Sequence, residues 1–183
     1  NNSTISNAYA TGLVTGQSIV GGLVGLNLNN SSISNAYATG SVTGQSLVGG
    51  LVGYNDNNST ISNTYATGAV TGLDYVGGLA GFNNGSISNA YVTGAVTGTN
   101  YAGGLVGYND NNSTISNAYA TGLVTGQNYV GGLVGYNANG SISNAYWNME
   151  TTGQLSGVGF GSNAGVGLTT AQMLFANSFV GFD

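Results

Sequence analysis

The sequence predicts an all-β protein, a parallel β-solenoid of about six coils with a short C-terminal cap that contains one small helix. The first observation behind this prediction is a repeat, since the motif I-S-N-x-Y occurs six times at steps of 26 to 28 residues. The isoleucines that open the six copies are Ile5, Ile33, Ile61, Ile87, Ile115 and Ile142. The second observation is an alternation of apolar with small or polar residues at a period of two, which is typical of strands. No helical pattern competes with it, so each copy predicts one coil that buries its apolar side by stacking on its neighbours.

Three segments of each copy favour the strand conformation. In the first copy they are residues 5–10, the segment around Val14, and residues 20–25, with glycines such as Gly12 and Gly16 between them for the turns. Three short strands per repeat suit a coil that climbs one strand spacing per turn, so that equivalent residues stack about 4.8 Å apart. On the sequence alone, a coil of four strands or two stacked layers of hairpins stays open as an alternative.

The inward-facing residues follow from the alternation within each copy. The expected core residues are Ile5, Val14, Val20, Leu23 and their equivalents in later copies. If Ile5 and Tyr9 both face inward, strict alternation directs Val14 outward, so we expect a turn or bulge at Gly12 to restore the phase. One asparagine per copy is expected to join an amide ladder, in which each side chain bonds the ones above and below it. These asparagines are Asn7, Asn35, Asn63, Asn89, Asn117 and Asn144.

The repeat pattern stops at Tyr146. It divides the chain into a repeat β-solenoid at residues 1–146, with about 28 residues per coil, and a cap or inter-array segment at residues 147–183. Thr169 and Gln172 have the spacing of a capping box and predict a helix of one to two turns over about 170–176. The apolar residues expected to close over the last coil are Phe175, Phe179, Val180 and Phe182. The first coil shows no comparable cap, as though further coils or another subunit preceded it.

The composition excludes several classes of partner. Among its 183 residues the chain has no Lys, Arg, His, Pro or Cys, and five acids give it a net charge of −5. Because it has no cation to neutralise phosphates, nucleic acid and anionic membrane surfaces are excluded as partners. No apolar stretch approaches the roughly 18 residues of a spanning helix, so we expect no membrane insertion. The absence of Lys and Arg also removes every cleavage site for trypsin-like proteases, which suits a protein exposed outside the cell.

The sequence predicts no catalytic, cofactor-binding or metal-binding residues. Polysaccharide-cleaving β-solenoids need clustered acids, usually with Arg or Lys, whereas Asp56 and Asp110 occupy one slot two copies apart. The serines and threonines have no base to activate them. The oxygen-rich residues 56–60 lack the glycine and distal glutamate of a calcium loop, so turn formation is the simpler interpretation. The glycines of residues 159–164 lack the strand and helix that flank a dinucleotide site.

Three repeated features are candidate binding or modification sites. Outward-facing threonine columns would form a flat array of a kind that can order water on ice, although hydrogen bonding between stacked threonines is the simpler explanation. These columns comprise Thr11, Thr15, Thr39, Thr43, Thr67, Thr71, Thr93, Thr97, Thr121 and Thr125. One N-x-S/T acceptor per copy marks candidate glycosylation sites at Asn2, Asn30, Asn58, Asn84, Asn112 and Asn139. Aromatic columns either stack on sugars or pack at coil corners, and we favour the corners. Their members are Tyr54, Phe82, Tyr108 and Tyr136, joined by Tyr75, Tyr101 and Tyr129.

The core of each copy resembles the GLUG motif of bacterial secreted surface proteins. In this chain it reads G-L-V-G or G-L-A-G, at residues 22–25, 50–53, 78–81, 104–107 and 132–135. The flanking Y-A-T-G-x-V-T-G resembles that family as well, and so does a tail with Y-W-N-M-E-T-T-G-Q and G-L-T-T-A-Q-M. The tail departs from the family at its end, which has Phe182 before Asp183 where the family usually has Trp-Asp. The resemblance implies an extracellular β-solenoid stalk in large adhesins of the filamentous-haemagglutinin-like type, and it implies no catalytic residues.

We therefore predict a non-enzymatic extracellular structural or adhesive module, a segment or subunit of a surface fibre that assembles end to end. Its expected partners are further copies of itself or neighbouring repeats of a longer chain, and a glycan or another surface ligand is a further candidate. The alternative is a binding module that uses the threonine or tyrosine columns for ice or carbohydrate.

Overall fold

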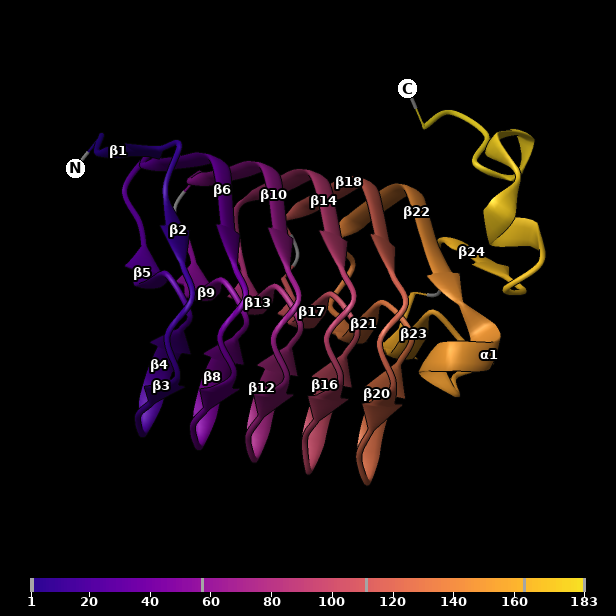
Figure 1. Ribbon diagram of the computed structural model, residues 1–183, viewed down its shortest axis with the longest axis horizontal. Coiled ribbons are helices and arrows are strands. Elements are labelled where there is room, and N and C mark those ends of the chain that lie inside the picture. Colours follow the sequence, from indigo (N-terminus) through magenta and orange to yellow (C-terminus); the bar gives the residue numbers. More distant parts are fainter. Residues whose placement is uncertain (1, 57, 111, 163, 183) are drawn as a thin grey trace.

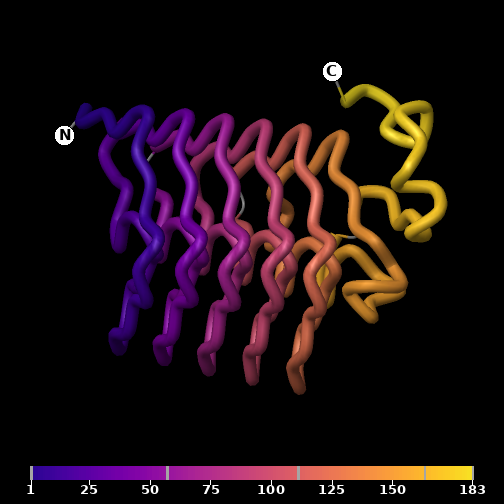
Figure 2. The backbone as a smooth tube through the Cα atoms, in the orientation of Figure 1, coloured from indigo at the N-terminus to yellow at the C-terminus, as the bar shows by residue number. Residues whose placement is uncertain are grey.

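The computed structural model describes residues 2–56, 58–110, 112–162 and 164–182, and it confirms the predicted parallel β-solenoid of about six coils (Figures 1 and 2). The coils lie side by side from the N-terminus to the cap, and the strand pairs that link them are parallel. Equivalent residues stack in register, so that Ile33 lies opposite both Ile5 and Ile61. The regular repeat of the sequence therefore becomes a regular repeat in space.

Equivalent strands of successive coils form four sheets, here called A to D. Sheet A contains β1 (Thr4–Ser6), β2 (Tyr9–Ala10), β6 (Ser32–Ala38), β10 (Thr60–Ala66), β14 (Ser86–Val92), β18 (Thr114–Ala120), β22 (Ser141–Asn148) and β24 (Val166–Leu168). Sheet B contains β3 (Val14–Thr15), β7 (Val42–Thr43), β11 (Val70–Thr71), β15 (Val96–Thr97) and β19 (Val124–Thr125). Sheet C contains β4 (Ser18–Gly21), β8 (Ser46–Gly49), β12 (Asp74–Gly77), β16 (Asn100–Gly103) and β20 (Asn128–Gly131). Sheet D contains β5 (Val24–Asn27), β9 (Val52–Asn55), β13 (Ala80–Asn83), β17 (Val106–Asn109), β21 (Val134–Asn137) and β23 (Val158–Gly161).

A coil therefore has four strands, which is the alternative that the sequence left open. The predicted third strand is in fact two strands, because the chain bends at the second glycine and the leucine of the G-G-L-V-G segment. In the second coil β8 ends at Gly49 and β9 begins at Val52, with Gly50 and Leu51 at the bend. Leu51 is fully buried, so the bend directs the leucine of each copy into the core.

The first five coils each enclose two apolar cores. The larger core lies between sheets A and D and is built from Ile33, Ala36, Ala38, Leu51 and Val52 with their equivalents in the other coils. The smaller core lies between sheets B and C in the narrow lower part of the coils in Figure 1. Its buried residues are Val20, Val42, Val48, Val70, Val76, Val96, Ala102 and Val124. The predicted core positions are thus confirmed, although they are divided between two compartments.

The reset of side-chain phase occurs at the asparagine of I-S-N-x-Y, and not at the following glycine. Asn35 has a φ of 50°, and the equivalent asparagines of the other coils have φ between 46° and 53°. One left-handed residue inverts the alternation along β6, so that Ile33, Ala36 and Ala38 are all buried while Tyr37 faces outward. Tyr9 likewise faces outward, so the inward orientation considered for it is wrong. Asparagine suits this position because its short polar side chain tolerates the left-handed region.

The predicted amide ladder forms along these left-handed asparagines on the outside of sheet A. Each side chain donates from Nδ2 to Oδ1 of the asparagine one coil earlier, at 3.1 to 3.3 Å. The ladder joins five of the six predicted asparagines, Asn35, Asn63, Asn89, Asn117 and Asn144, and these bonds do not include Asn7 of the first coil. The sequence thus identified the ladder correctly, and its left-handed backbone explains why asparagine occupies the position.

A second column of residues with a left-handed backbone conformation lies in sheet C, and its residue types suit that conformation poorly. The members of this column have φ between 52° and 56°, and they are Ile19, Leu47, Tyr75, Tyr101 and Tyr129. Branched and bulky side chains are strained in this region, at a cost of about 1 to 2 kcal/mol per residue. The conformation directs these side chains outward and leaves the next residue, such as Val48, fully buried.

We expect the substitution Ile19→Asn to stabilise the protein. Ile19 has a φ of 56° and is 38% exposed, so burial offsets little of its strain. Asparagine adopts this conformation readily, and we expect the free energy of unfolding to rise by about 1 kcal/mol. Urea denaturation measures the change, with Ser18→Asn as a matched control that shifts stability by less than about 0.5 kcal/mol. Unchanged or lower stability of Ile19→Asn would show that this column is not strained.

The cap extends the solenoid by two strands before the chain leaves it. Strand β22 runs on through Asn148, β23 then pairs with β21, and β24 pairs with β22. Trp147 occupies the register position of Ala120 in the preceding coil and is only 4% exposed. Its indole Nε1 donates to the Gln154 carbonyl at 2.8 Å. This one large side chain therefore covers the end of the larger core.

The small helix of the cap is not where the sequence placed it. Helix α1 spans Met149–Thr152 and is capped by the Asn148 side chain, which accepts from the backbone N–H groups of Glu150 and Thr151. The segment predicted as helix, 170–176, instead contains the 3₁₀ turn η1 (Gln172–Leu174), and a second turn, η2 (Ala176–Ser178), follows it. The reciprocal Thr169–Gln172 hydrogen bonds of the capping box do form, at 2.9 and 3.2 Å. Phe175 is extended between the two turns, which prevents a continuous helix.

The four apolar residues of the C-terminal tail, defined as residues 169–182, do not close over the last coil as expected. Phe175 and Val180 are exposed, while Phe179 and Phe182 pack on the outer face of sheet A against Tyr119 and Tyr146. Figure 1 shows the tail rising beside the solenoid, away from α1. The tyrosine column outside sheet A attracts these phenylalanines because it offers aromatic partners that the coil end, filled by Trp147, lacks.

Candidate functional site

The structure presents the ten predicted threonines as an outward-facing array along sheet B. Nine are exposed and Thr121 is half-buried. The column from Thr15 to Thr125 stacks in register, and Thr125 Oγ1 donates to Thr97 Oγ1 at 3.2 Å. The residues between the two columns are Leu13, Ser41, Ala69, Ala95 and Leu123, all of which are exposed. The array is regular along the solenoid, and a leucine interrupts it near each end.

The aromatic columns present ring edges to the solvent, and not ring faces. Phe82 stacks on Tyr54 and on Tyr108 with centroids 4.8 Å apart, and Tyr75 stacks on Tyr101 at 4.8 Å. The two columns then meet edge to face, as between Tyr101 and Tyr108 at 6.2 Å and 69°. Since neighbouring rings cover one another along the column, the inner rings have no free face on which a sugar could stack. This arrangement agrees with packing at a coil corner, the interpretation favoured from the sequence.

A third aromatic column lies outside sheet A. Its rings stack with centroids 4.8 to 5.3 Å apart and interplanar angles of 10° or less. The members are Tyr9, Tyr37, Tyr65, Tyr91 and Tyr119. The column exists because the left-handed asparagine two residues earlier directs the tyrosine outward, a reversal that simple alternation did not reveal.

Tyrosine ionisation is expected to control stability at alkaline pH. Burial raises the pKa of Tyr54, Tyr108 and Tyr119 above the ordinary value of 10.0, and the charge of Asp56 raises the pKa of Tyr54 further. The chain has no Lys, Arg or His, so few other side chains titrate between neutrality and pH 10. The folded protein therefore holds these phenolic protons more tightly than the unfolded chain does.

We expect the free energy of unfolding to stay constant from about pH 6 to pH 9 and to fall above about pH 10. The stabilisation from the raised pKa values is complete below the unfolded-state pKa and is lost as the pH rises through the folded-state pKa. Urea denaturation across this range measures the fall, while tyrosinate absorbance shows whether ionisation accompanies it. Stability that is constant beyond about pH 11 would contradict the link to these phenols.

The candidate glycosylation sites differ in accessibility. Asn2, Asn30, Asn58, Asn112 and Asn139 are exposed at turns outside the strands. Asn84 is half-buried, and its Nδ2 donates to the Asp56 carboxylate at 2.7 Å. The structure thus places five of the six acceptors where an enzyme could reach them, and whether any is modified stays a prediction.

A buried amide ladder runs through the solenoid that the sequence interpretation did not identify. Each asparagine at the end of a sheet D strand donates from Nδ2 to Oδ1 of the next one, at 2.8 to 2.9 Å. The ladder joins Asn27, Asn55, Asn83, Asn109 and Asn137, each of which is 5% exposed or less. Further bonds fix the side chains, as where Asn83 Oδ1 accepts from the Gly85 N–H at 3.3 Å. The signal was the recurring G-x-N at the end of each copy.

Glycines bring sheets C and D into direct backbone contact. A methyl group on Gly107 would lie 2.6 Å from the Gly81 oxygen and 2.6 Å from backbone atoms of both Tyr75 and Val76. A methyl group on Gly77 would lie 2.0 Å from the Ala80 oxygen. Side chains of any size would separate the two sheets, so the glycines of G-G-L-V-G determine how closely the walls of the coil approach.

Two of the acids are hydrogen-bonded to asparagines of the following coil. Asp74 accepts from Asn100 Nδ2 at 2.6 Å, and Asp56 accepts from Asn84, which stands between Asp56 and Asp110 in the coil series. Over the described ranges of the chain, no group of three or more acidic, histidine or cysteine side chains converges on a point. Asn57, within the oxygen-rich loop, lies outside the described residues.

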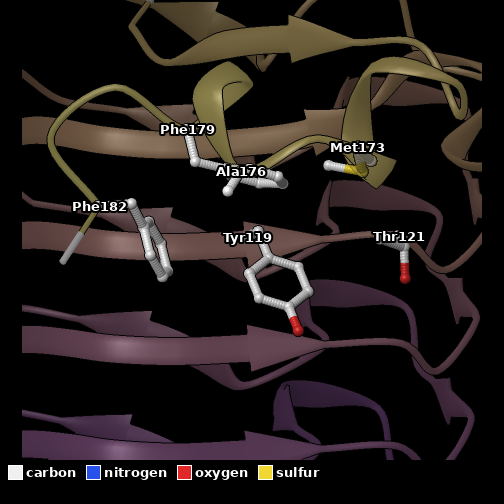
Figure 3. A pocket seen from close by; sticks show the side chains of 6 residues that line it. All are labelled: Tyr119, Thr121, Met173, Ala176, Phe179 and Phe182. Carbon is white, nitrogen blue, oxygen red and sulfur yellow. The ribbon is translucent and has the colours of Figure 1, made fainter.

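An apolar groove separates the C-terminal tail from the solenoid (Figure 3). It has a volume of about 390 Å³ and is lined by Tyr119, Thr121, Met173, Ala176, Phe179 and Phe182. Figure 3 shows Phe182, Ala176 and Met173 of the tail across the groove from Tyr119 and Thr121. This groove was not predictable from the sequence pattern, because it arises where the tail meets an outward tyrosine that strict alternation directs inward.

Tyr119 is the last stacked ring of its column. One face lies on Tyr91 at 5.1 Å and 5°, but the other side meets Phe179 and Phe182 at 6.4 and 6.2 Å, inclined by 62° and 54°. Tyr146, the next residue of the series, is buried and packs edge-on against Phe179 at 5.0 Å. Its hydroxyl donates to the Val180 carbonyl at 2.6 Å, which holds the tail in place. The C-terminal side of Tyr119 therefore opens into the groove and is not covered by a parallel ring.

Comparisons with known proteins agree with the geometry. The sequence model of a protein family described as the GLUG motif matches residues 16–43, 44–71, 72–97, 98–125 and 126–150. A comparison with curated protein sequences found no match. Among solved structures, the chain resembles one described as a candidate immunoglobulin A1 protease from Bacteroides ovatus, with a TM-score of 0.73 and 22% identity. The alignment covers all of this chain and 71% of the other, and at this identity it shows the fold alone.

Proposed function

Since this chain belongs to the family of the GLUG motif, we propose that it is a non-enzymatic structural or adhesive module that acts outside the cell. The observation that carries the proposal is the way in which the repeated residues are used. The positions that recur in every coil are buried core residues, left-handed asparagines, stacked rings and glycines at close backbone contacts. Repetition at these positions maintains a scaffold, and among the described residues they assemble no reactive site.

An extracellular location is supported by the resemblance to secreted surface proteins and by the absence of Lys and Arg. No helix within the described residues is long and apolar enough to cross a membrane. Labelling of intact producing cells with an antibody against the solenoid tests the location. Signal on intact cells is expected, and signal that appears only after the cells are permeabilised would contradict it.

Self-association is proposed through the first coil. Its core residues Ile5, Leu23 and Val24 are partly buried, whereas the equivalent Ile33, Leu51 and Val52 are fully buried. One further coil, from another copy or from neighbouring repeats of a longer chain, would complete their burial and pair the strand edge. Trp147 and α1 cover the opposite end of the solenoid, so we expect contact at the first coil to dominate. Sedimentation that shows only monomers at high concentration would exclude another copy as the partner.

Ice binding through the threonine array is a second candidate, favoured by the exposure of nine of the ten threonines. Flat, regular hydroxyl and methyl rows on a rigid sheet are the feature that supports it. Thermal hysteresis of the purified protein tests it, with Thr71→Tyr to disrupt the array and Thr60→Tyr, an exposed site in sheet A, as the matched control. Activity lost only in Thr71→Tyr is the expected result, and an absence of hysteresis in the parent protein would exclude this candidate.

A further inference from the structure

We propose that the groove between the C-terminal tail and Tyr119 binds a small quaternary ammonium cation of the trimethylammonium type. The three rings of Tyr119, Phe179 and Phe182 converge there, with centroids 5.9 to 6.4 Å apart and mutual inclinations of 54° to 64°. Rings inclined to one another at such angles can line a cavity with π surface on more than one side, as in the aromatic cages that recognise methylated ammonium groups. The inference is independent of the structural role proposed above.

The groove differs from the interior of the aromatic columns in holding a ring, Tyr119, that is stacked on one side alone. Along the columns each ring covers its neighbour at about 5 Å, as Tyr65 is covered by Tyr37 at 4.8 Å and by Tyr91 at 4.9 Å. A cation–π contact requires the ring face, because the negative lobe of the quadrupole lies there. Tyr119 lacks a parallel partner on its C-terminal side and faces the groove.

Charge and hydrogen-bonding capacity select the chemical class of the ligand. The chain carries a net charge of −5 and has no Lys or Arg, so its field attracts cations and offers no partner to an anion. Among the lining residues only Tyr119 and Thr121 carry a hydroxyl, so a sugar would leave most of its hydroxyl groups unpaired. A trimethylammonium group has no hydrogen bond to lose, and its methyl groups can contact Met173 and Ala176. The Glu150 carboxylate, which accepts from the Thr170 N–H at 2.9 Å, adds negative charge at the start of the tail.

The test is an NMR titration of the whole chain with choline, observed at the Met173 methyl group. Choline is expected to bind at least about tenfold more tightly than 3,3-dimethylbutan-1-ol, its neutral isostere, because only choline gains the cation–π term. Phosphocholine is expected to bind more weakly than choline, since its phosphate meets no cation in this chain. This comparison separates a free quaternary ammonium compound from a lipid headgroup as the source of the ligand. Equal binding of choline and the neutral isostere, or no response to choline, would overturn the proposal.

Variants locate the binding to the groove. Tyr119→Leu is expected to weaken choline binding by about tenfold, whereas Tyr65→Leu, at a ring covered on both faces, should leave it unchanged. If Tyr119→Leu unfolds, Phe182→Leu alters the groove from the tail side and is expected to weaken binding in the same way. Thermal melting of each variant separates loss of binding from loss of folding. An equal effect of Tyr65→Leu and Phe182→Leu would show that choline binds elsewhere on the aromatic surface.

Discussion

Replacing Asn83 by alanine is expected to lower the free energy of unfolding by about 3 to 5 kcal/mol. Asn83 is fully buried, accepts from Asn55 Nδ2 at 2.9 Å and donates to Asn109 Oδ1 at 2.9 Å. Alanine leaves both of these groups and the Gly85 N–H without their partner in a place that water does not reach. Urea denaturation followed by circular dichroism measures the loss.

The matched control for this experiment is Asn89→Gly. Asn89 belongs to the exposed ladder, where it bonds Asn63 and Asn117, and its φ of 51° suits glycine. Water can replace the exposed amide bonds, so we expect a loss below about 1 kcal/mol. If the two substitutions cost the same, burial of the inner ladder would not be the source of its stabilisation.

The substitution Gly107→Ala is expected to cost at least about 3 kcal/mol and to shift the unfolding transition strongly, or to prevent folding. The added methyl group would lie 2.6 Å from a backbone atom of each of Gly81, Tyr75 and Val76, and backbone atoms cannot rotate away as the end of a side chain could. Sheets C and D would have to separate locally, which opens the contact between the two cores. Thermal unfolding and the yield of folded protein measure this effect.

Gly12→Ala provides the contrast within the same repeat pattern. Nothing lies within 4 Å of a methyl group at Gly12, so alanine should change stability by less than about 1 kcal/mol, in the stabilising direction. A large cost at Gly12 together with a small cost at Gly107 would contradict the conclusion that backbone contact between the sheets explains the glycines of the motif.

Much of the fold was predictable because the repeat supplies its own alignment. Six copies set side by side showed which positions were always apolar, and residues such as Ile33, Val42 and Leu51 are buried as expected. The exposed asparagine ladder also followed, because stacking in register brings identical side chains together.

The sequence predictions failed where the backbone conformation of a single residue reverses which of the following side chains face inward. The left-handed backbone at Asn35 turns Tyr37 outward, and a strict period of two does not contain that information. The buried ladder through Asn83 was missed for a related reason. Asparagine is common at turns, so its presence at the end of each copy needs no further explanation from the sequence. Only the closed coil shows that these side chains point inward.

The groove beside Tyr119 depends on tertiary contacts that no local pattern encodes. The tail is held by Tyr146, whose hydroxyl donates to Val180, and by Asn144, whose Nδ2 donates to the Gly181 carbonyl at 2.7 Å. Both partners lie more than 30 residues away in the sequence. The capping box at Thr169 was read correctly as hydrogen bonds, but the extended Phe175 converts the expected helix into two short turns.

We propose that the coils are interchangeable structural units whose number sets the length of a rigid rod. The most direct test inserts three further copies of residues 98–125, a complete coil, and measures the particle by small-angle X-ray scattering. We expect the longest dimension to increase by about 14 Å, three strand spacings, with an unchanged cross-section and cooperative unfolding. An expanded particle, a wider cross-section or a loss of cooperativity would contradict the claim, because it would show that the coils are not equivalent units of one stack.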